Sequence, residues 1–184
     1  MRVRYFRYLL GTALTAIVGT TGYSTNSKAV QLRDGTFYFN QPPRLVEAAT
    51  TYNDVSIWGG TYYFTLSLPE NAVEPLQRIT INQHEGIDNI RFLLKDSYVF
   101  EGTRGNQGQK LTLQDITASS KTRTVSLILN PPVPPGKTIT IAMKPLQNPT
   151  VSGVYLFGVT AYPAGEKSHG QFLGYGRLQF YSHF

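Results

Sequence analysis

The sequence predicts an all-β protein, an immunoglobulin-like β-sandwich of about eight strands with an N-terminal extension. Two observations support this prediction: apolar and polar side chains alternate in short runs, and turn residues separate the runs at regular spacing. Alternation places one set of side chains on a buried face and the other toward solvent. Two sheets that pack their buried faces together form a sandwich. After Ala29, no helical periodicity lasts beyond about two turns.

The predicted strands follow from this alternation. The clearest run is residues 60–68, which Pro69 ends; its large apolar positions are Tyr62, Phe64, Leu66 and Leu68. A run over residues 154–161 is apolar on both faces, as expected of a central strand. Residues 30–52 form the extension, which we expect to add strands or to pack along an edge. The other predicted strands lie around Ile79 and Ile81; Ile90, Phe92 and Leu94; Val125, Leu127 and Leu129; Ile139, Ile141 and Met143; and residues 177–181.

Glycine and proline separate these runs and predict the turns. The glycine-rich residues 102–108 indicate a hairpin tip, where Arg104 and Asn106 are candidate contact residues because recognition residues often lie on loops. Residues 131–135 contain four prolines, which cannot pair at the centre of a sheet. We therefore expect an extended crossover there, and a short helical turn within residues 69–76.

Residues 1–29 have the pattern of a signal peptide. A basic start precedes an apolar stretch at residues 9–19, and the small residues Ser27 and Ala29 suit cleavage after Ala29. The apolar stretch is too short for a membrane core that needs about 20 residues. We therefore expect export without stable membrane insertion, and residues 30–184 as a single domain that is periplasmic or secreted.

Charge and cysteine content exclude several kinds of partner and site. The net charge is +6, but four of the 17 basic residues and none of the 11 acidic ones precede Val30, which leaves a net charge of +2. Nucleic-acid binding needs clustered cations, so no nucleic-acid partner is expected. The absence of cysteine excludes a thiol nucleophile, a thiolate metal site and a lipoprotein anchor.

Several stretches of the chain match a known pattern of residues. The most specific are Pro-Pro-Val-Pro-Pro-Gly at 131–136, Gly-Val-Tyr-Leu-Phe at 153–157, and Leu-Gly-Tyr-Gly-Arg-Leu-Gln-Phe-Tyr at 173–181. With residues 68–72, 79–86 and 148–165, they span nearly the whole chain after Ala29. The chain thereby resembles a mainly cyanobacterial family of exported proteins, the domain of unknown function 2808. The resemblance implies an extracytoplasmic location and brings no activity with it.

The leading functional hypothesis is a non-catalytic binding or structural module of the cell envelope, with an envelope protein or a glycan as partner and no cofactor. Aromatic residues could supply such contacts, because amphipathic rings suit interfaces. We interpret Trp58 and Tyr62 as core residues. Tyr63 points to the opposite face and is the better candidate for surface contact, together with Arg104 and Asn106.

The main alternative is an extracytoplasmic copper- or zinc-binding protein. His84, His169 and Met143 are ligand types that suit these metals. They form no closely spaced pair, so folding would have to assemble the site. We therefore predict no metal site from the spacing alone.

Two lesser alternatives are a hydrolase and a small outer-membrane barrel. Glu166, Ser168 and His169 offer an acid, a nucleophile and a base, but adjacent residues on a strand point to opposite faces. A barrel is suggested by the alternating apolar residues that lead to Phe184, but it needs strands of about 9 to 11 residues, and most runs here are shorter. We therefore predict that the protein is not an enzyme.

Overall fold

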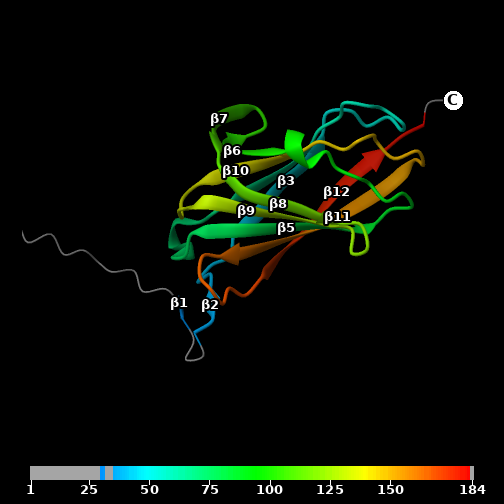
Figure 1. The fold of residues 1–184 in the computed structure, drawn as a ribbon. Helices are drawn as coiled ribbons and strands as arrows, with labels where there is room; N and C mark the ends of the chain where they lie inside the picture. Colours follow the sequence, from blue (N-terminus) through cyan, green and yellow to red (C-terminus); the bar gives the residue numbers. More distant parts are fainter. Residues whose placement is uncertain (1–29, 32–34, 183–184) are drawn as a thin grey trace, which may run out of the picture.

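The computed structural model describes residues 30–31 and 35–182, so the predicted signal peptide lies outside the described residues. The described chain forms a two-layer β-sandwich with two short 3₁₀ turns (Figure 1). The described part of the chain contains no helix with the length and apolar character that a membrane span requires. The elements are β1 (Val30–Gln31), β2 (Phe37–Tyr38), β3 (Arg44–Thr50), β4 (Tyr62–Ser67), η1 (Glu70–Ala72), β5 (Leu76–Glu85), η2 (Leu94–Asp96), β6 (Tyr98–Thr103), β7 (Asn106–Leu111), β8 (Leu113–Ser119), β9 (Thr124–Val133), β10 (Thr138–Met143), β11 (Gly153–Pro163) and β12 (Gln171–Phe180).

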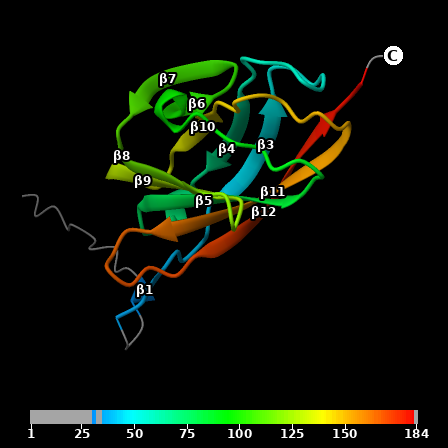
Figure 2. The same ribbon diagram turned by 45° about the vertical axis from the view of Figure 1, so that its right-hand side comes forward.

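Two five-stranded antiparallel sheets make up the sandwich. The first sheet has the order β3-β4-β10-β6-β7 and the second β12-β11-β5-β9-β8 (Figure 2). β1 and β2 pair separately. At one side the sheets meet where β12 packs against β3. At the other side, the single residue Thr112 carries the chain from β7 in one sheet to β8 in the other. The space between the two sheets is filled by their side chains.

The predicted all-β sandwich is confirmed, with more strands than expected. β11 lies between β12 and β5, which confirms the central strand. The extension adds β3 at the edge of the first sheet, and the helical turn expected within residues 69–76 is η1.

The strand predicted around Ile90, Phe92 and Leu94 is wrong. Ile90 is buried, but its backbone N–H donates to the Gln83 side-chain oxygen at 2.9 Å instead of to a neighbouring strand. Phe92 forms only an isolated bridge with Pro145, and Leu94 begins η2. The apolar alternation here belongs to a loop that covers one end of the core.

The proline-rich crossover begins later than predicted, because Pro131, Pro132 and Val133 belong to the end of β9. The register between β9 and β5 is irregular at this point: Ile128 pairs with Arg78, and the next partners are Val133 and Leu76. The prolines therefore fall where the ladder is interrupted and where their missing N–H groups cost nothing. The crossover to β10 consists of residues 134–137.

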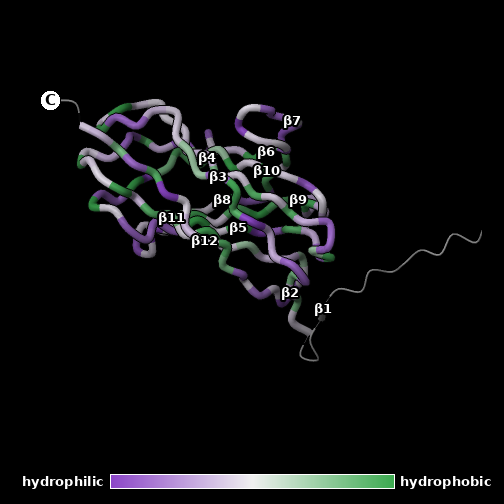
Figure 3. The backbone as a smooth tube through the Cα atoms, turned by 180° about the vertical axis from the view of Figure 1, so that it is seen from behind, coloured by the Kyte–Doolittle hydropathy of each residue, from purple (hydrophilic) through white to green (hydrophobic). Residues whose placement is uncertain are grey.

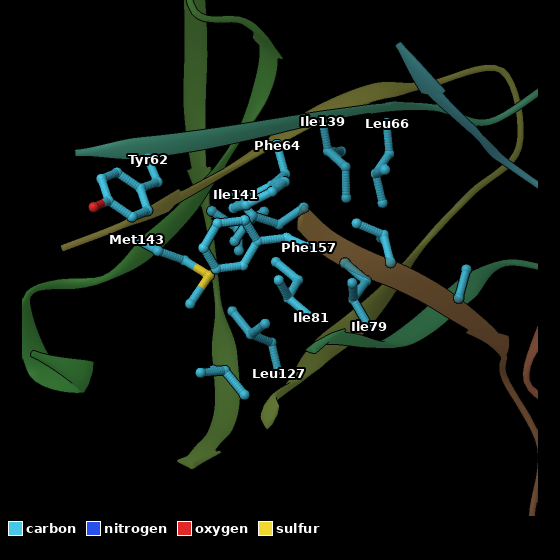
Figure 4. Packing of buried hydrophobic residues seen from close by; sticks show 14 of the residues in the cluster. Tyr62, Phe64, Leu66, Ile79, Ile81, Leu127, Ile139, Ile141, Met143 and Phe157 are labelled. Atoms are coloured by element: carbon cyan, nitrogen blue, oxygen red, sulfur yellow. The ribbon is translucent and has the colours of Figure 1, made fainter. Parts of the chain in front are cut away.

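The core lies between the two sheets and consists of their inward-facing apolar side chains (Figure 4). Phe157 of β11 is central, with ring centroids 5.6 Å from Phe64 and 6.0 Å from Tyr62 in edge-to-face geometry. The hydropathy colouring changes repeatedly along the strands, and hydrophilic residues dominate β7 (Figure 3). The labelled core residues are Tyr62, Phe64, Leu66, Ile79, Ile81, Leu127, Ile139, Ile141, Met143 and Phe157.

One buried acid stands out beside this core. Glu74, between η1 and β5, is only 7% exposed, and its Oε1 has no hydrogen-bond partner among the described residues. Burial raises the pKa of Glu74 above its ordinary value of 4.5, because the carboxylate loses its hydration. The folded state therefore favours the protonated acid, and stability falls as the pH rises from the unfolded-state pKa through the higher folded-state pKa.

We predict that Glu74→Gln stabilises the protein at neutral pH. The neutral amide avoids the cost of burying a poorly hydrogen-bonded carboxylate, so the free energy of unfolding should rise by about 1 kcal/mol near pH 7. The gain should vanish near pH 4, where the wild-type acid is largely protonated. Urea denaturation at both pH values measures it, with the exposed Glu47→Gln as control. Equal gains at the two pH values would contradict the explanation.

Candidate functional site

The β6–β7 hairpin forms one wall of the candidate site and makes up one edge of the first sheet. Thr103 pairs with Asn106, so Arg104 and Gly105 form the tip, which confirms the predicted hairpin. The Thr140 hydroxyl of β10 donates to the Gly102 carbonyl at 2.8 Å and ties the hairpin to the sheet. Phe100 and Thr140 are both buried, although they alternate with core positions and belong to the outer face.

Two tyrosines flank one residue of β10 on the outer face of the sheet, and a cation lies over each ring. Tyr63 of β4 and Tyr98 of β6 both pair with the small residue Ala142 of β10. The Arg104 guanidinium carbon lies 5.5 Å from the centre of the Tyr63 ring, and the Lys110 ammonium lies 4.6 Å from that of Tyr98. Burial, and then the neighbouring Tyr63, raise the pKa of the Tyr98 hydroxyl. Each of the two tyrosine rings is thus paired with one cation.

Beside Tyr98 lies a hollow of about 750 Å³. Trp58 and Leu93 on its wall are 64% and 41% exposed, which is unusual for large apolar side chains. Its lining includes three lysines and one acid: Lys95, Lys110, Lys144 and Asp96. We call the hollow and the adjoining tyrosines the basic aromatic surface, defined by Trp58, Tyr63, Leu93, Lys95, Tyr98, Arg104, Lys110 and Lys144.

Trp58 is presented by a loop that is fixed from within the core. The buried Asn148 side chain donates to the carbonyls of Tyr52 at 3.1 Å and Asp54 at 2.8 Å, and accepts from the Tyr62 hydroxyl at 3.0 Å. Its backbone N–H donates to the Ile57 carbonyl at 2.8 Å. These bonds hold both ends of residues 52–57 and thereby fix the backbone that leads into Trp58.

The interpretation of Trp58 as a core residue is wrong, whereas that of Tyr62 is confirmed. Tyr62 is fully buried in β4, and burial raises the pKa of its hydroxyl. Trp58 lies in the loop before β4, where the alternation of the strand does not apply, and its ring faces solvent. Because Trp58 lies outside the alternating run, only its hydrophobicity could be used to predict its burial.

The structure brings two of the three predicted contact residues together. Tyr63 and Arg104 form one cation–π pair, while Asn106 begins β7 and is exposed beside the tip. Sequence reasoning missed the three lysines and Tyr98. The lysines come from three separate segments, so no run of positive charge marked them in the sequence.

The metal-ligand candidates lie in different parts of the fold. Met143 is fully buried between the sheets, and His84 is exposed on β5, where its ring lies 4.9 Å from that of Tyr175. His169 is exposed in the loop before β12, 4.7 Å from the Tyr38 ring. Across residues 35–182, no group of three or more histidine and acidic side chains is arranged to hold a metal ion.

The three residues of the hydrolase alternative belong to the loop between β11 and β12. Glu166 and His169 are exposed, and Ser168 forms an isolated bridge with Phe37 of β2. The His169 ring packs against Tyr38, and its backbone N–H donates to the Phe37 carbonyl at 3.0 Å. This loop therefore serves to attach β2 to the second sheet.

Two solved structures are similar to this chain at low sequence identity. The collagen-binding domain of a Staphylococcus aureus adhesin is 12% identical, with a TM-score of 0.37 over 76% of this chain and 98% of that one. The C-terminal domain of the Streptococcus pyogenes antigen I/II-family protein AspA is 12% identical, with a TM-score of 0.43 over 76% of this chain and 47% of that one. No curated protein matches the chain. A family model described as a protein of unknown function, DUF2808, matches residues 36–180, and the chain belongs to this family.

Proposed function

We propose that the protein is a non-catalytic binding module that works outside the cytoplasm, in the cell envelope, and holds its partner on the basic aromatic surface. The location follows from the signal peptide predicted at residues 1–29 and from the exported, mainly cyanobacterial family that the sequence resembles. The partner is an envelope component, either a protein or a glycan.

The observation that carries this proposal is the exposed Trp58 ring beside three lysines, next to a backbone segment that Asn148 fixes. Large aromatic side chains in hollows are typical anchors of binding sites, since a ring buries much apolar area with few rotatable bonds. A loop that is already fixed by Asn148 loses little entropy on binding. The hollow of about 750 Å³ lies in the size range of ligand sites.

The non-catalytic reading rests on the chemistry of this surface. Its titratable groups are lysines, an arginine and tyrosines, and the one acid of the hollow, Asp96, is exposed. A general acid–base pair or an activated nucleophile requires a base within hydrogen-bond reach of the reacting group. The surface is instead suited to attraction of charge and stacking of rings.

Truncation of the anchor tests the proposal. Trp58→Ala should weaken binding of the purified protein to isolated envelope fragments at least about tenfold, as loss of an aromatic anchor typically does. Ile87→Ala is the matched control, since Ile87 is 74% exposed and lies outside the hollow. Co-sedimentation across a protein concentration series measures both. Equal binding by the two variants would place the contact elsewhere.

A further inference from the structure

We infer that the ligand of the basic aromatic surface is an anionic glycan, a polysaccharide that carries carboxylate groups along its chain. This inference rests on the proposed function and specifies the partner of that same site. Three properties of the surface support it: the orientation of its rings, the distribution of its charges and the pairing of the strands beneath it.

The rings are placed to stack rather than to fill pockets. Trp58 is 64% exposed, and Tyr63 and Tyr98 lie on the outer face of the sheet with Ala142 between them. Arg104 and Lys110 each lie over one of these two tyrosine rings, so the ring most open to stacking is that of Trp58. Sugar rings have an apolar C–H face and a polar rim, and amphipathic aromatic rings match such partly apolar, partly wet partners. An aliphatic ligand would instead need an enclosed apolar pocket.

The charges around these rings favour an anion. Residues 30–184 are nearly balanced, with 13 basic and 11 acidic side chains. The lining of the hollow, by contrast, contains three lysines and one acid, Asp96. Arg104 adds a fourth cation beside Tyr63. Lysines are single point charges, and here they come from η2, β7 and the segment after β10. Separated single charges match carboxylates spaced along a chain better than one doubly charged phosphate.

Strand pairing argues against an extended acidic peptide. β10 is paired with β4 and β6, and β6 with β10 and β7, so the strands beneath Tyr63 and Tyr98 offer no free backbone ladder, and the unpaired edge of the sheet is on β7, at the wall of the site. A peptide that adds a strand to a sheet needs such a free edge for its main-chain hydrogen bonds. Recognition above the strands beneath Tyr63 and Tyr98 must therefore use side chains, as a glycan allows.

The test uses the full chain with three defined polymers. Polygalacturonate supplies carboxylated sugar rings, dextran supplies neutral ones, and poly-L-glutamate supplies carboxylates on a polypeptide. We expect binding to polygalacturonate by isothermal titration calorimetry or affinity electrophoresis, and at least about tenfold weaker binding to the other two. Equal affinity for poly-L-glutamate, tighter binding to dextran, or no binding to polygalacturonate would overturn the inference.

Variants separate the contributions of ring and charge. Trp58→Ala should weaken polygalacturonate binding at least about tenfold, and Lys95→Gln with Lys144→Gln should reduce its salt dependence, because fewer counterions are exchanged. Lys121→Gln, an exposed lysine in the β8–β9 turn, is the control for net charge. The lysine pair tests the site independently of Trp58. An equal reduction by Lys121→Gln would overturn the site assignment.

The two proposals fail in different ways. Trp58-dependent binding to envelope fragments without binding to polygalacturonate would overturn the glycan inference and leave the binding function intact. Absence of Trp58-dependent binding to envelope fragments as well as to the polymers would overturn both.

Discussion

Asn148→Asp is expected to lower the free energy of unfolding by about 3 kcal/mol or more, although it exchanges only an NH₂ group for an oxygen. The Asn148 Nδ2 donates to the carbonyls of Tyr52 and Asp54, while Oδ1 accepts from Tyr62. A carboxylate would place a charge against two carbonyl oxygens at a side chain that is 2% exposed. Urea denaturation measures the loss.

The same substitution at Asn89 is the matched control. Asn89 is exposed, and its side chain makes one long hydrogen bond of 3.4 Å to the Ser120 carbonyl, so Asn89→Asp should change stability by less than about 0.5 kcal/mol. Burial would also raise the pKa of the carboxyl introduced at position 148, so its deficit should shrink as the pH falls. A deficit independent of pH would contradict this explanation.

Asn148 also connects the fold to the proposed site. The Asn148 hydrogen bonds fix residues 52–57, so Asn148→Asp should loosen this loop and make the position of Trp58 more variable. Ligand binding should then weaken even under conditions in which the protein still folds. Asn148 is therefore a positioning residue: it does not line the hollow, but it fixes the backbone beside Trp58. Loss of binding without loss of folding would separate this role from a purely structural one.

The core strands could be predicted from the sequence because their burial follows the same period as their backbone. Phe64, Ile79, Leu127 and Ile141 all lie in predicted runs and all pack between the sheets. β7 could not be predicted in this way, since every residue except Leu111 is exposed and no apolar alternation marks it. β7 lies at the edge of its sheet and buries almost none of its surface, so no alternation of apolar residues is required there.

Site residues could be predicted only where a local sequence pattern, such as a turn or a strand alternation, determines their position. Arg104 follows from the glycine-rich hairpin and Tyr63 from the alternation of β4. Lys95, Lys110 and Lys144 meet only because η2, β7 and the segment after β10 lie together in space. Trp58 was misplaced because its exposure depends on hydrogen bonds to Asn148, which lies 90 positions along the chain.

Gly86→Ala is expected to destabilise the protein by about 3 kcal/mol or more, for two reasons that act together. Gly86 has φ +119°, a conformation that costs other residues about 1 to 3 kcal/mol. A Cβ there would also overlap the ring of Tyr155, which is 1% exposed, packs edge-on against Phe180, and donates from its hydroxyl to the Val151 carbonyl. Overpacking of a core position adds about 1 to 3 kcal/mol.

Gly105→Ala makes the same chemical change where neither reason applies. Gly105 has no positive φ, and a Cβ there would have no atom within 4 Å, so thermal and urea unfolding should shift by less than about 0.5 kcal/mol. Tyr155→Ala combined with Gly86→Ala separates the two causes. If the overlap matters, the double variant should lose less than the sum of the single losses, because the space that the Cβ needs is then open. Strict additivity would assign the whole cost of Gly86→Ala to its backbone conformation.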